Sequence, residues 1–179
     1  MKATGEAAFS KSFPCSRTTA LVVVSDRSAR GEREDASGDV LARRLAEEGY
    51  TVAFRSVVPD EVPRIVEVLR LHADVNKVAL VVTTGGTGVA PRDVTPEATL
   101  EVANRLVPGM AEAMRAASLL KTPHAMISRA VAGIRARTLI VNLPGSPKGA
   151  LENLEVLLPA LPHALEKIQG DPSECAGGA

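Results

Sequence analysis

Six consecutive small residues, Thr83-Thr84-Gly85-Gly86-Thr87-Gly88, give this 179-residue chain its clearest candidate for ligand chemistry. Glycine tolerates positive φ angles and lets the backbone approach a ligand closely, and successive N–H groups can form a nest for an anion. The run has neither the Gly-Lys-Ser/Thr ending of a P-loop nor the spacing of a dinucleotide fingerprint. By itself it fits a phosphate-binding loop and a tight surface turn equally well.

Two aspartates follow strand-like segments. Asp93 comes five residues after Gly88 and just before a predicted helix, and Asp60 follows Pro59. Either carboxylate could simply close a local turn or cap a helix. Placed together from two strand ends, they could instead hold one Mg²⁺, a cation that takes oxygen ligands and keeps several waters. Arg92 could pair with a ligand oxygen or remain solvated.

Two further polar loops follow apolar runs. In Pro144-Gly145-Ser146-Pro147-Lys148, Ser146 is placed to cap a helix whose first residue is proline. Such a helix N-terminus can bind a phosphate, and Lys148 would add positive charge. A well-capped turn with a surface lysine is the structural alternative. Earlier in the chain, Ser25 and Asp26 could hydrogen-bond a base or a sugar.

Composition excludes several classes of protein. The formal net charge is +0, whereas a generic nucleic-acid binder needs a basic face. Aromatic residues make up only 2%, which argues against modules that stack bases on Phe, Tyr or Trp. His72, His124 and His163 are scattered without zinc spacing and are interpreted as structural or exposed. No Gly-x-Ser-x-Gly nucleophile motif is present.

The elements that must position these loops alternate between strand and helix. Continuous apolar runs predict buried strands, and caps, prolines and apolar spacing predict the helices between them. The predicted strands are 19–25, 51–58, 77–83, 125–132 and 138–143. The predicted helices are 37–48 with Ser37 as its cap, 61–73, one that opens with Thr95 as its cap, 110–120, and 148–169 with a break near Pro159 and Pro162. This order predicts an α/β fold with a mostly parallel sheet and helices on both faces. Ligands then lie beyond the carboxyl ends of the strands, where the polar loops are.

The chain is predicted to be one domain, 19–170, with a disordered leader at 1–18 and a flexible tail at 171–179. Only Cys15 and Cys175 are present, near the ends, which favours a reducing cytoplasm over a disulfide framework. No apolar run reaches the roughly 18 residues of a membrane span, and the leader lacks the apolar core of a secretory signal. We therefore expect no membrane association.

Together these loops resemble one family. The stretches TTGGTGVAPRDVTPEATLEV, PGMAEAMRAASL, ISRAVAGIR and TLIVNLPGSPKGALENLEVLLPALPHAL occur in the order seen in molybdopterin adenylyltransferases. These are the bacterial MogA/MoaB proteins and the G domains of gephyrin and its plant homologue. VVVSDRSARGEREDASG fits the first loop of that family, so the resemblance covers about residues 19–170.

The resemblance implies a three-layer α/β/α domain, commonly a trimer, that joins AMP from Mg-ATP to the phosphate of molybdopterin. Pyrophosphate is released, and a molybdenum insertase would use the product. Carried over by position, Asp60 and Asp93 match the two essential aspartates, here assigned to metal handling. Segments lining the substrate sites match Thr84, Gly85, Gly86, Thr87, Gly88, Ser128, Arg129, Pro144, Gly145, Ser146 and Lys148. The alternatives are a non-catalytic molybdopterin carrier or scaffold, and hydrolysis of a nucleotide pyrophosphate on the same domain type.

Overall fold

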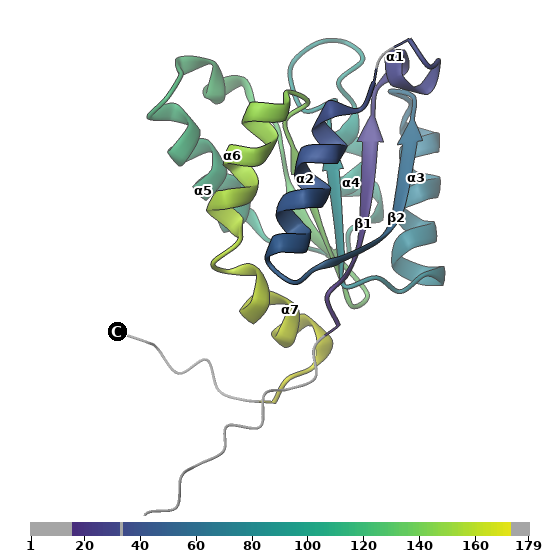
Figure 1. The fold of residues 1–179 in the computed structure, drawn as a ribbon, viewed down its shortest axis with the longest axis vertical. Helices are drawn as coiled ribbons and strands as arrows, with labels where there is room; N and C mark the ends of the chain where they lie inside the picture. Colours follow the sequence, from purple (N-terminus) through teal and green to yellow (C-terminus); the bar gives the residue numbers. More distant parts are fainter. Residues whose placement is uncertain (1–15, 33, 173–179) are drawn as a thin grey trace, which may run out of the picture.

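A computed structural model describes residues 16–32 and 34–172, and it contains one six-stranded sheet between two layers of helices (Figure 1). The strands follow the order β2-β1-β3-β6-β5-β4 across the sheet. Neighbours among β2, β1, β3 and β6 run parallel, whereas β5 is antiparallel to β6 and β4 to β5. The strands are β1 (Thr18–Val24), β2 (Thr51–Val58), β3 (Leu80–Thr84), β4 (Arg105–Leu106), β5 (Ala132–Arg135) and β6 (Thr138–Leu143). The predicted mostly parallel α/β sheet is confirmed.

Two separate apolar clusters explain the three layers. On one face Leu41, Met114 and Leu154 pack against the sheet, so α2, α5, α6 and α7 cover that side. On the other face Ile65, Leu69 and Val102 pack from α3 and α4. Parallel strands covered on both faces need continuous aliphatic runs, and β1, β3 and β6 supply them. The helices are α1 (Asp26–Ala29), α2 (Ala36–Glu47), α3 (Val62–Arg70), α4 (Thr95–Val102), α5 (Pro108–Leu119), α6 (Pro147–Leu157) and α7 (Leu161–Gln169).

One predicted strand is wrong. The sequence predicts that residues 125–132 are extended, but Pro123–Ile127 forms the 3₁₀ helix η2 and β5 begins only at Ala132. Thr122 accepts a hydrogen bond from the His124 N–H, and the fixed φ of Pro123 suits the first position of a helical turn. The local capping signal therefore wins over the strand propensity of this segment.

Other boundaries move by a few residues. The third strand begins at Leu80 instead of 77, because Lys77 has a left-handed φ of 51° that cannot continue a strand. The helix expected over 61–73 is α3 followed by the π-helical turn η1 (Leu71–Val75). The predicted break in the last helix is confirmed as the gap between α6 and α7.

The cap of α2 also differs from the prediction. Asp35, not Ser37, accepts the hydrogen bond from the Gly38 N–H at 2.7 Å. Ser37 lies in the first turn and its hydroxyl donates to the Gly145 carbonyl oxygen at 2.9 Å. The aspartate is a strong cap two residues earlier, so the serine is free to tie α2 to the loop after β6.

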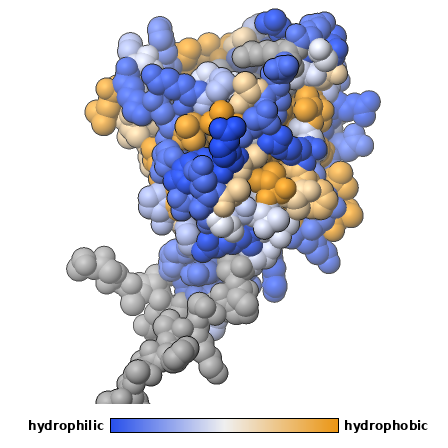
Figure 2. All heavy atoms as spheres, in the orientation of Figure 1, coloured by the Kyte–Doolittle hydropathy of each residue, from blue (hydrophilic) through white to orange (hydrophobic). Residues whose placement is uncertain are grey.

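The predicted leader and tail fall mainly outside the described residues, as do Cys15 and Cys175. At the inner margin of the leader, Ser16 is joined to Gln169 of α7 by two hydrogen bonds, at 2.8 and 3.0 Å. Within residues 16–32 and 34–172, no helix combines the length and apolarity needed to cross a bilayer. The face seen in Figure 2 is largely hydrophilic, with smaller hydrophobic groups between the polar side chains.

His72 is a buried structural histidine, as predicted. Its Nδ1 lies 3.0 Å from the Asn76 amide nitrogen and its Nε2 lies 3.0 Å from the Ser56 hydroxyl. With the amide nitrogen donating to Nδ1, the ring is neutral and carries its proton on Nε2. Burial lowers the pKa of His72 below its ordinary value, because desolvation disfavours the charged form.

The stability of the fold should therefore fall in mild acid. Because the unfolded chain binds a proton near pH 6.5 and folded His72 resists it, stability is complete above that pH. It should decline below pH 6.5 by up to about 1.4 kcal/mol per pH unit. Urea unfolding of the natural chain and His72→Gln between pH 8 and pH 5 measures this slope, with exposed His163→Gln as the control. Equal slopes for the natural chain and His72→Gln would contradict the assignment.

Candidate functional site

The polar loops after β1, β2, β3 and β6 meet at the carboxyl ends of the parallel strands, as predicted. They enclose a cavity of about 360 Å³, here called the acidic cavity. It is lined by Val23, Val24, Ser25, Ser28, Glu34, Asp35, Ala36, Ser37, Asp60, Thr84, Gly85, Gly86, Asp93, Gly145 and Ser146. Among the described residues, four of these carry a carboxylate and none carries a positive charge. An anionic ligand therefore needs a cation here.

The glycine-rich loop takes a shape that other residues would resist. Gly85 and Gly86 have φ angles of 102° and 62°, and a Cβ on Gly85 would overlap the Val24 carbonyl oxygen. The buried Thr95 holds the loop by two hydrogen bonds. Its hydroxyl donates to the Gly85 carbonyl oxygen at 2.8 Å, and its N–H donates to the Gly86 carbonyl oxygen at 3.1 Å. The sequence predicts that Thr95 caps α4, but it is the first helical residue and Val94 is the cap.

Asp60 does not cap α3, whose cap is Glu61. Its Oδ2 instead accepts the Asp26 N–H at 2.8 Å. Oδ1 points toward Gly86, on which a Cβ would lie 3.2 Å away. Burial raises the pKa of the Asp60 carboxyl above its ordinary value and the Asp26 N–H acts in the opposite direction, while the negative charges of Asp26 and Asp93 add to the increase. The helix-cap interpretation is wrong, and this carboxylate faces the cavity.

Asp93 stabilises a local turn and also lines the acidic cavity. Its Oδ2 accepts the Ala90 N–H at 2.8 Å, and its own N–H donates to the Ala90 carbonyl oxygen at 2.9 Å. A Cβ on Gly88 would come within 2.8 Å of the same Oδ2. The turn interpretation is thus confirmed for one oxygen of the carboxylate, while the residue also lines the same cavity as Asp60.

The N-terminus of α6 forms part of the wall. Ser146 caps it as predicted, accepting the Gly149 N–H at 3.2 Å, and Pro147 is the first helical residue. The Thr84 hydroxyl donates to the Pro144 carbonyl oxygen at 2.7 Å, which joins this loop to the end of β3. The positive end of the α6 dipole therefore lies at the cavity.

A second cavity of about 280 Å³, here called the α5–α6 cavity, shares Ser146 with the first. Four other predicted site residues line it: Thr87, Gly88, Ser128 and Pro144. The sequence interpretation missed its remaining walls, which are Arg115, Ser118, Lys121, Thr122, His124, Ala125, Ile127, Gly149, Glu152 and Asn153. Arg115 with Ser118, and Gly149 with Glu152 and Asn153, recur at the three- and four-residue spacing of one helix face. That polar spacing was the available signal.

Three predicted binding residues line neither cavity. Asp26 is held by Arg92 through Nε–Oδ2 and Nη2–Oδ1 contacts of 2.6 and 2.8 Å, and this pairing lowers the pKa of Asp26. The Arg129 guanidinium donates to the Gly88 oxygen at 2.6 Å, to the Asp93 carbonyl oxygen and to the Glu97 carboxylate. Lys148 is exposed one residue beyond Pro147. Asp26 and Arg129 are thus bound to the loops that carry the site.

The carboxylates of the acidic cavity could bind a cation if a bound ligand supplies further oxygen atoms. No group of three or more His, Cys, Asp or Glu side chains in residues 16–32 and 34–172 could enclose a metal ion. Asp60 and Asp93 offer two carboxylates on one cavity. Mg²⁺ in phosphate-transferring sites is usually held by one or two carboxylates together with waters and substrate phosphates. The donor set therefore suits Mg²⁺ bound with a phosphate ligand.

The comparisons with known proteins agree with this geometry. A family model described as a probable molybdopterin binding domain matches residues 20–163. The molybdopterin adenylyltransferase of Helicobacter pylori is 44% identical, the match covering 84% of this chain and 87% of that protein. Gephyrin of Dictyostelium discoideum is 43% identical over 85% of this chain, which corresponds to 22% of that longer protein.

A solved structure gives the same result in three dimensions. The molybdopterin biosynthesis enzyme MoaB from Thermus thermophilus superposes with a TM-score of 0.82 at 54% sequence identity. The superposition covers 88% of this chain and 99% of the other. The cavities described above therefore lie within the region shared with these relatives.

Removing the Thr95 hydroxyl should loosen the glycine-rich loop. Thr95→Val keeps the volume but leaves the buried Gly85 carbonyl without its partner, which costs about 1–3 kcal/mol. Urea unfolding measures that loss, and hydrogen exchange at the Gly85 and Gly86 amides reports the loop. Thr95→Ser keeps the hydroxyl and serves as the control. If the Gly85 and Gly86 amides exchange at the same rate in Thr95→Val and in Thr95→Ser, the hydroxyl does not hold the loop.

Proposed function

Because this chain belongs to the molybdopterin-binding domain family, we infer that it is a molybdopterin adenylyltransferase acting in molybdenum cofactor biosynthesis. The observation that carries the inference is the pair of adjoining cavities around the glycine-rich loop and the α6 N-terminus. A transfer between two substrates needs two neighbouring sites with a common boundary, and Ser146 lies on that boundary.

In the proposed reaction, a phosphate oxygen of molybdopterin attacks the α-phosphorus of ATP. A new P–O bond forms, the bond from that phosphorus to its bridging oxygen breaks, and pyrophosphate leaves with the oxygen. The attacking phosphate is already ionised at neutral pH, so no strong general base is required. The protein's task is to bring two anions together, by positioning them and by stabilising charge.

We assign this task to groups of the acidic cavity. Asp60 and Asp93 would hold Mg²⁺, which when bound supplies positive charge to the phosphate oxygens. Backbone N–H groups of the loop from Gly86 to Gly88 and the α6 N-terminus at Ser146 would provide the donors for phosphate, since the Gly85 N–H donates to Leu143. Ser25 and Thr84 are committed within the protein, because Ser25 caps α1 and Thr84 bonds Pro144. Their proposed role is to shape the cavity.

We further propose a cytoplasmic homotrimer whose product is taken up by a molybdenum insertase. Several large apolar side chains are exposed near one another in sequence on β4, at the C-terminal end of α5 and on η2. Among them are Leu120, the residue after α5, at 90% and Met126 of η2 at 68%. Clustered apolar exposure of this kind marks interaction surfaces. That gephyrin of D. discoideum carries further sequence beyond the matched region agrees with a partner acting next to this domain.

Adenylyl transfer can be tested directly. Purified protein with molybdopterin, ATP and Mg²⁺ should yield adenylyl-molybdopterin and pyrophosphate, and Asp60→Asn and Asp93→Asn should each lower kcat by roughly 100-fold or more. Molybdopterin binding should change much less. Glu61→Gln, which removes an exposed charge beside Asp60, is the control. Tight pterin binding with no ATP-dependent product would show a carrier instead, and ATP hydrolysis without adenylyl transfer would show a hydrolase.

The proposed trimer can be tested by measuring the mass of the protein in solution. Sedimentation should give three times the 18.7 kDa of one chain, and Leu120→Lys combined with Met126→Lys should lower it, because two charges would be buried in the interface. Leu71→Lys, at an exposed apolar site on the opposite layer, should leave the mass unchanged. A monomeric natural chain would contradict the trimer.

A further inference from the structure

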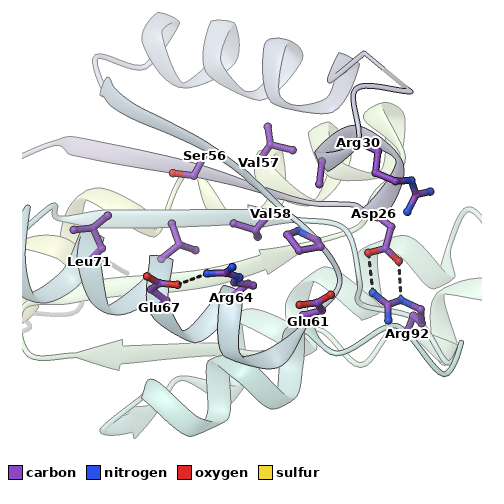
Figure 3. Close-up of a pocket in the computed structure, with 13 residues that line it drawn as sticks. Asp26, Arg30, Ser56, Val57, Val58, Glu61, Arg64, Glu67, Leu71 and Arg92 are labelled. Atoms are coloured by element: carbon purple, nitrogen blue, oxygen red, sulfur yellow. Dashed lines mark hydrogen bonds and ion pairs between the residues drawn. The ribbon is translucent and has the colours of Figure 1, made fainter.

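An ion pair lies on the outer side of the candidate site, away from the acidic cavity. Asp26 and Arg92 line a different depression, a groove of about 1040 Å³ along the edge strand β2 (Figure 3). The pair is bidentate, because both carboxylate oxygens of Asp26 accept from the Arg92 guanidinium. Neither residue lines either cavity proposed to hold substrate. Asp26 and Arg92, as placed here, therefore do not contact the reacting groups directly.

Asp26 and Asp60 are joined by reciprocal hydrogen bonds. The Asp26 N–H donates to Asp60 Oδ2 at 2.8 Å, and the Asp60 N–H donates to Asp26 Oδ1 at 3.1 Å. Each backbone thus binds the other residue's carboxylate, which fixes the rotation of both side chains. With Oδ2 committed, Oδ1 of Asp60 is the oxygen directed at Gly86 and the cavity.

Arg92 connects the same pair to Asp93. The two residues are adjacent in sequence, and the turn from Ala90 to Asp93 is closed by its own two hydrogen bonds. When Asp26 holds Arg92, it also holds that turn against the loops after β1 and β2. The loop after each of three strands is therefore tied to one carboxylate, that of Asp26.

We propose that Asp26 and Arg92 are positioning residues, which set the separation of Asp60 and Asp93 required to bind the reaction's divalent cation. The proposal rests on the proposed function of those two aspartates. Mg²⁺ demands nearly ideal octahedral geometry, so a small change in carboxylate spacing weakens binding. Outer partners that orient metal ligands typically account for about 10–100-fold in metal affinity or activity. An exposed ion pair adds little to stability, so the bidentate geometry acts on orientation.

Divalent-ion binding provides the test, with Mn²⁺ as the probe. Free Mn²⁺ measured by electron paramagnetic resonance, with and without ATP, should show binding about 10–100-fold weaker in Asp26→Asn and Arg92→Gln. In adenylyl transfer, kcat should fall while the KM for molybdopterin stays constant. Arg92→Lys should recover only part of the effect, because a lysine cannot form the two-pronged contact. The double variant should be no worse than either single variant.

The control is Arg64→Gln, which removes a guanidinium paired with Glu67 in the same groove. It should leave Mn²⁺ binding unchanged, and all variants should melt near the natural chain. If Asp26→Asn binds Mn²⁺ as tightly as the natural chain does, the positioning role is wrong. It is also wrong if the KM for molybdopterin rises while metal binding is unchanged, because Asp26 would then contact the substrate. If the natural chain itself binds no Mn²⁺ in the presence of ATP, the proposed metal site at Asp60 and Asp93 is wrong. That result differs from one in which the natural chain and the variants bind Mn²⁺ equally, which would contradict only the positioning role.

Discussion

The repulsion between like charges governs the design of this site. Asp60 and Asp93 face one cavity with Glu34 and Asp35 beside them, and no described lining residue is basic. Burial raises the pKa of Asp60 most, and the negative charges of Asp26 and Asp93 add to the increase. Yet the proposed substrates are themselves anions that must approach each other. A cation between carboxylates and phosphates resolves both repulsions, and hydrogen bonds from the surrounding loops keep the carboxylates in place before it arrives.

The glycine-rich loop follows from the same constraint. Phosphate groups that cannot be met by basic side chains have to be met by backbone N–H groups and a helix N-terminus, and these must come very close. Gly85 leaves no room for a Cβ against Val24, and Gly86 none against Thr95. Thr95 and Arg129 then fix the loop by their hydrogen bonds. The positive φ angles thus allow close approach, and the buried threonine makes the loop rigid.

Sequence patterns predicted what depends on local signals. The aliphatic runs placed the parallel strands, and the carboxyl-end rule then placed Asp60, Asp93, Gly85, Gly86 and Ser146 around one cavity. The sequence patterns did not predict which hydrogen bond each polar side chain makes. Ser37 and Thr95 bond other loops instead of capping helices. Asp35 caps α2 two residues earlier, which leaves the Ser37 hydroxyl for the distant Gly145, and Thr95 lies one residue inside α4 and bonds Gly85. The α5–α6 cavity was missed for a similar reason, since it exists only where two helices pack together.

The zero net charge and the scarcity of aromatic residues are consistent with such a site. Tyr50 is buried and Phe54 lies on the edge strand, so no Phe, Tyr or Trp of the described residues lines either cavity. A planar adenine or pterin ring must then be held by aliphatic walls and by hydrogen bonds at its edges, which discriminate between ligands more strictly than stacking does. Recognition consequently depends on exact loop geometry. The residues that hold the loops should thus matter to function as much as those that touch the substrates.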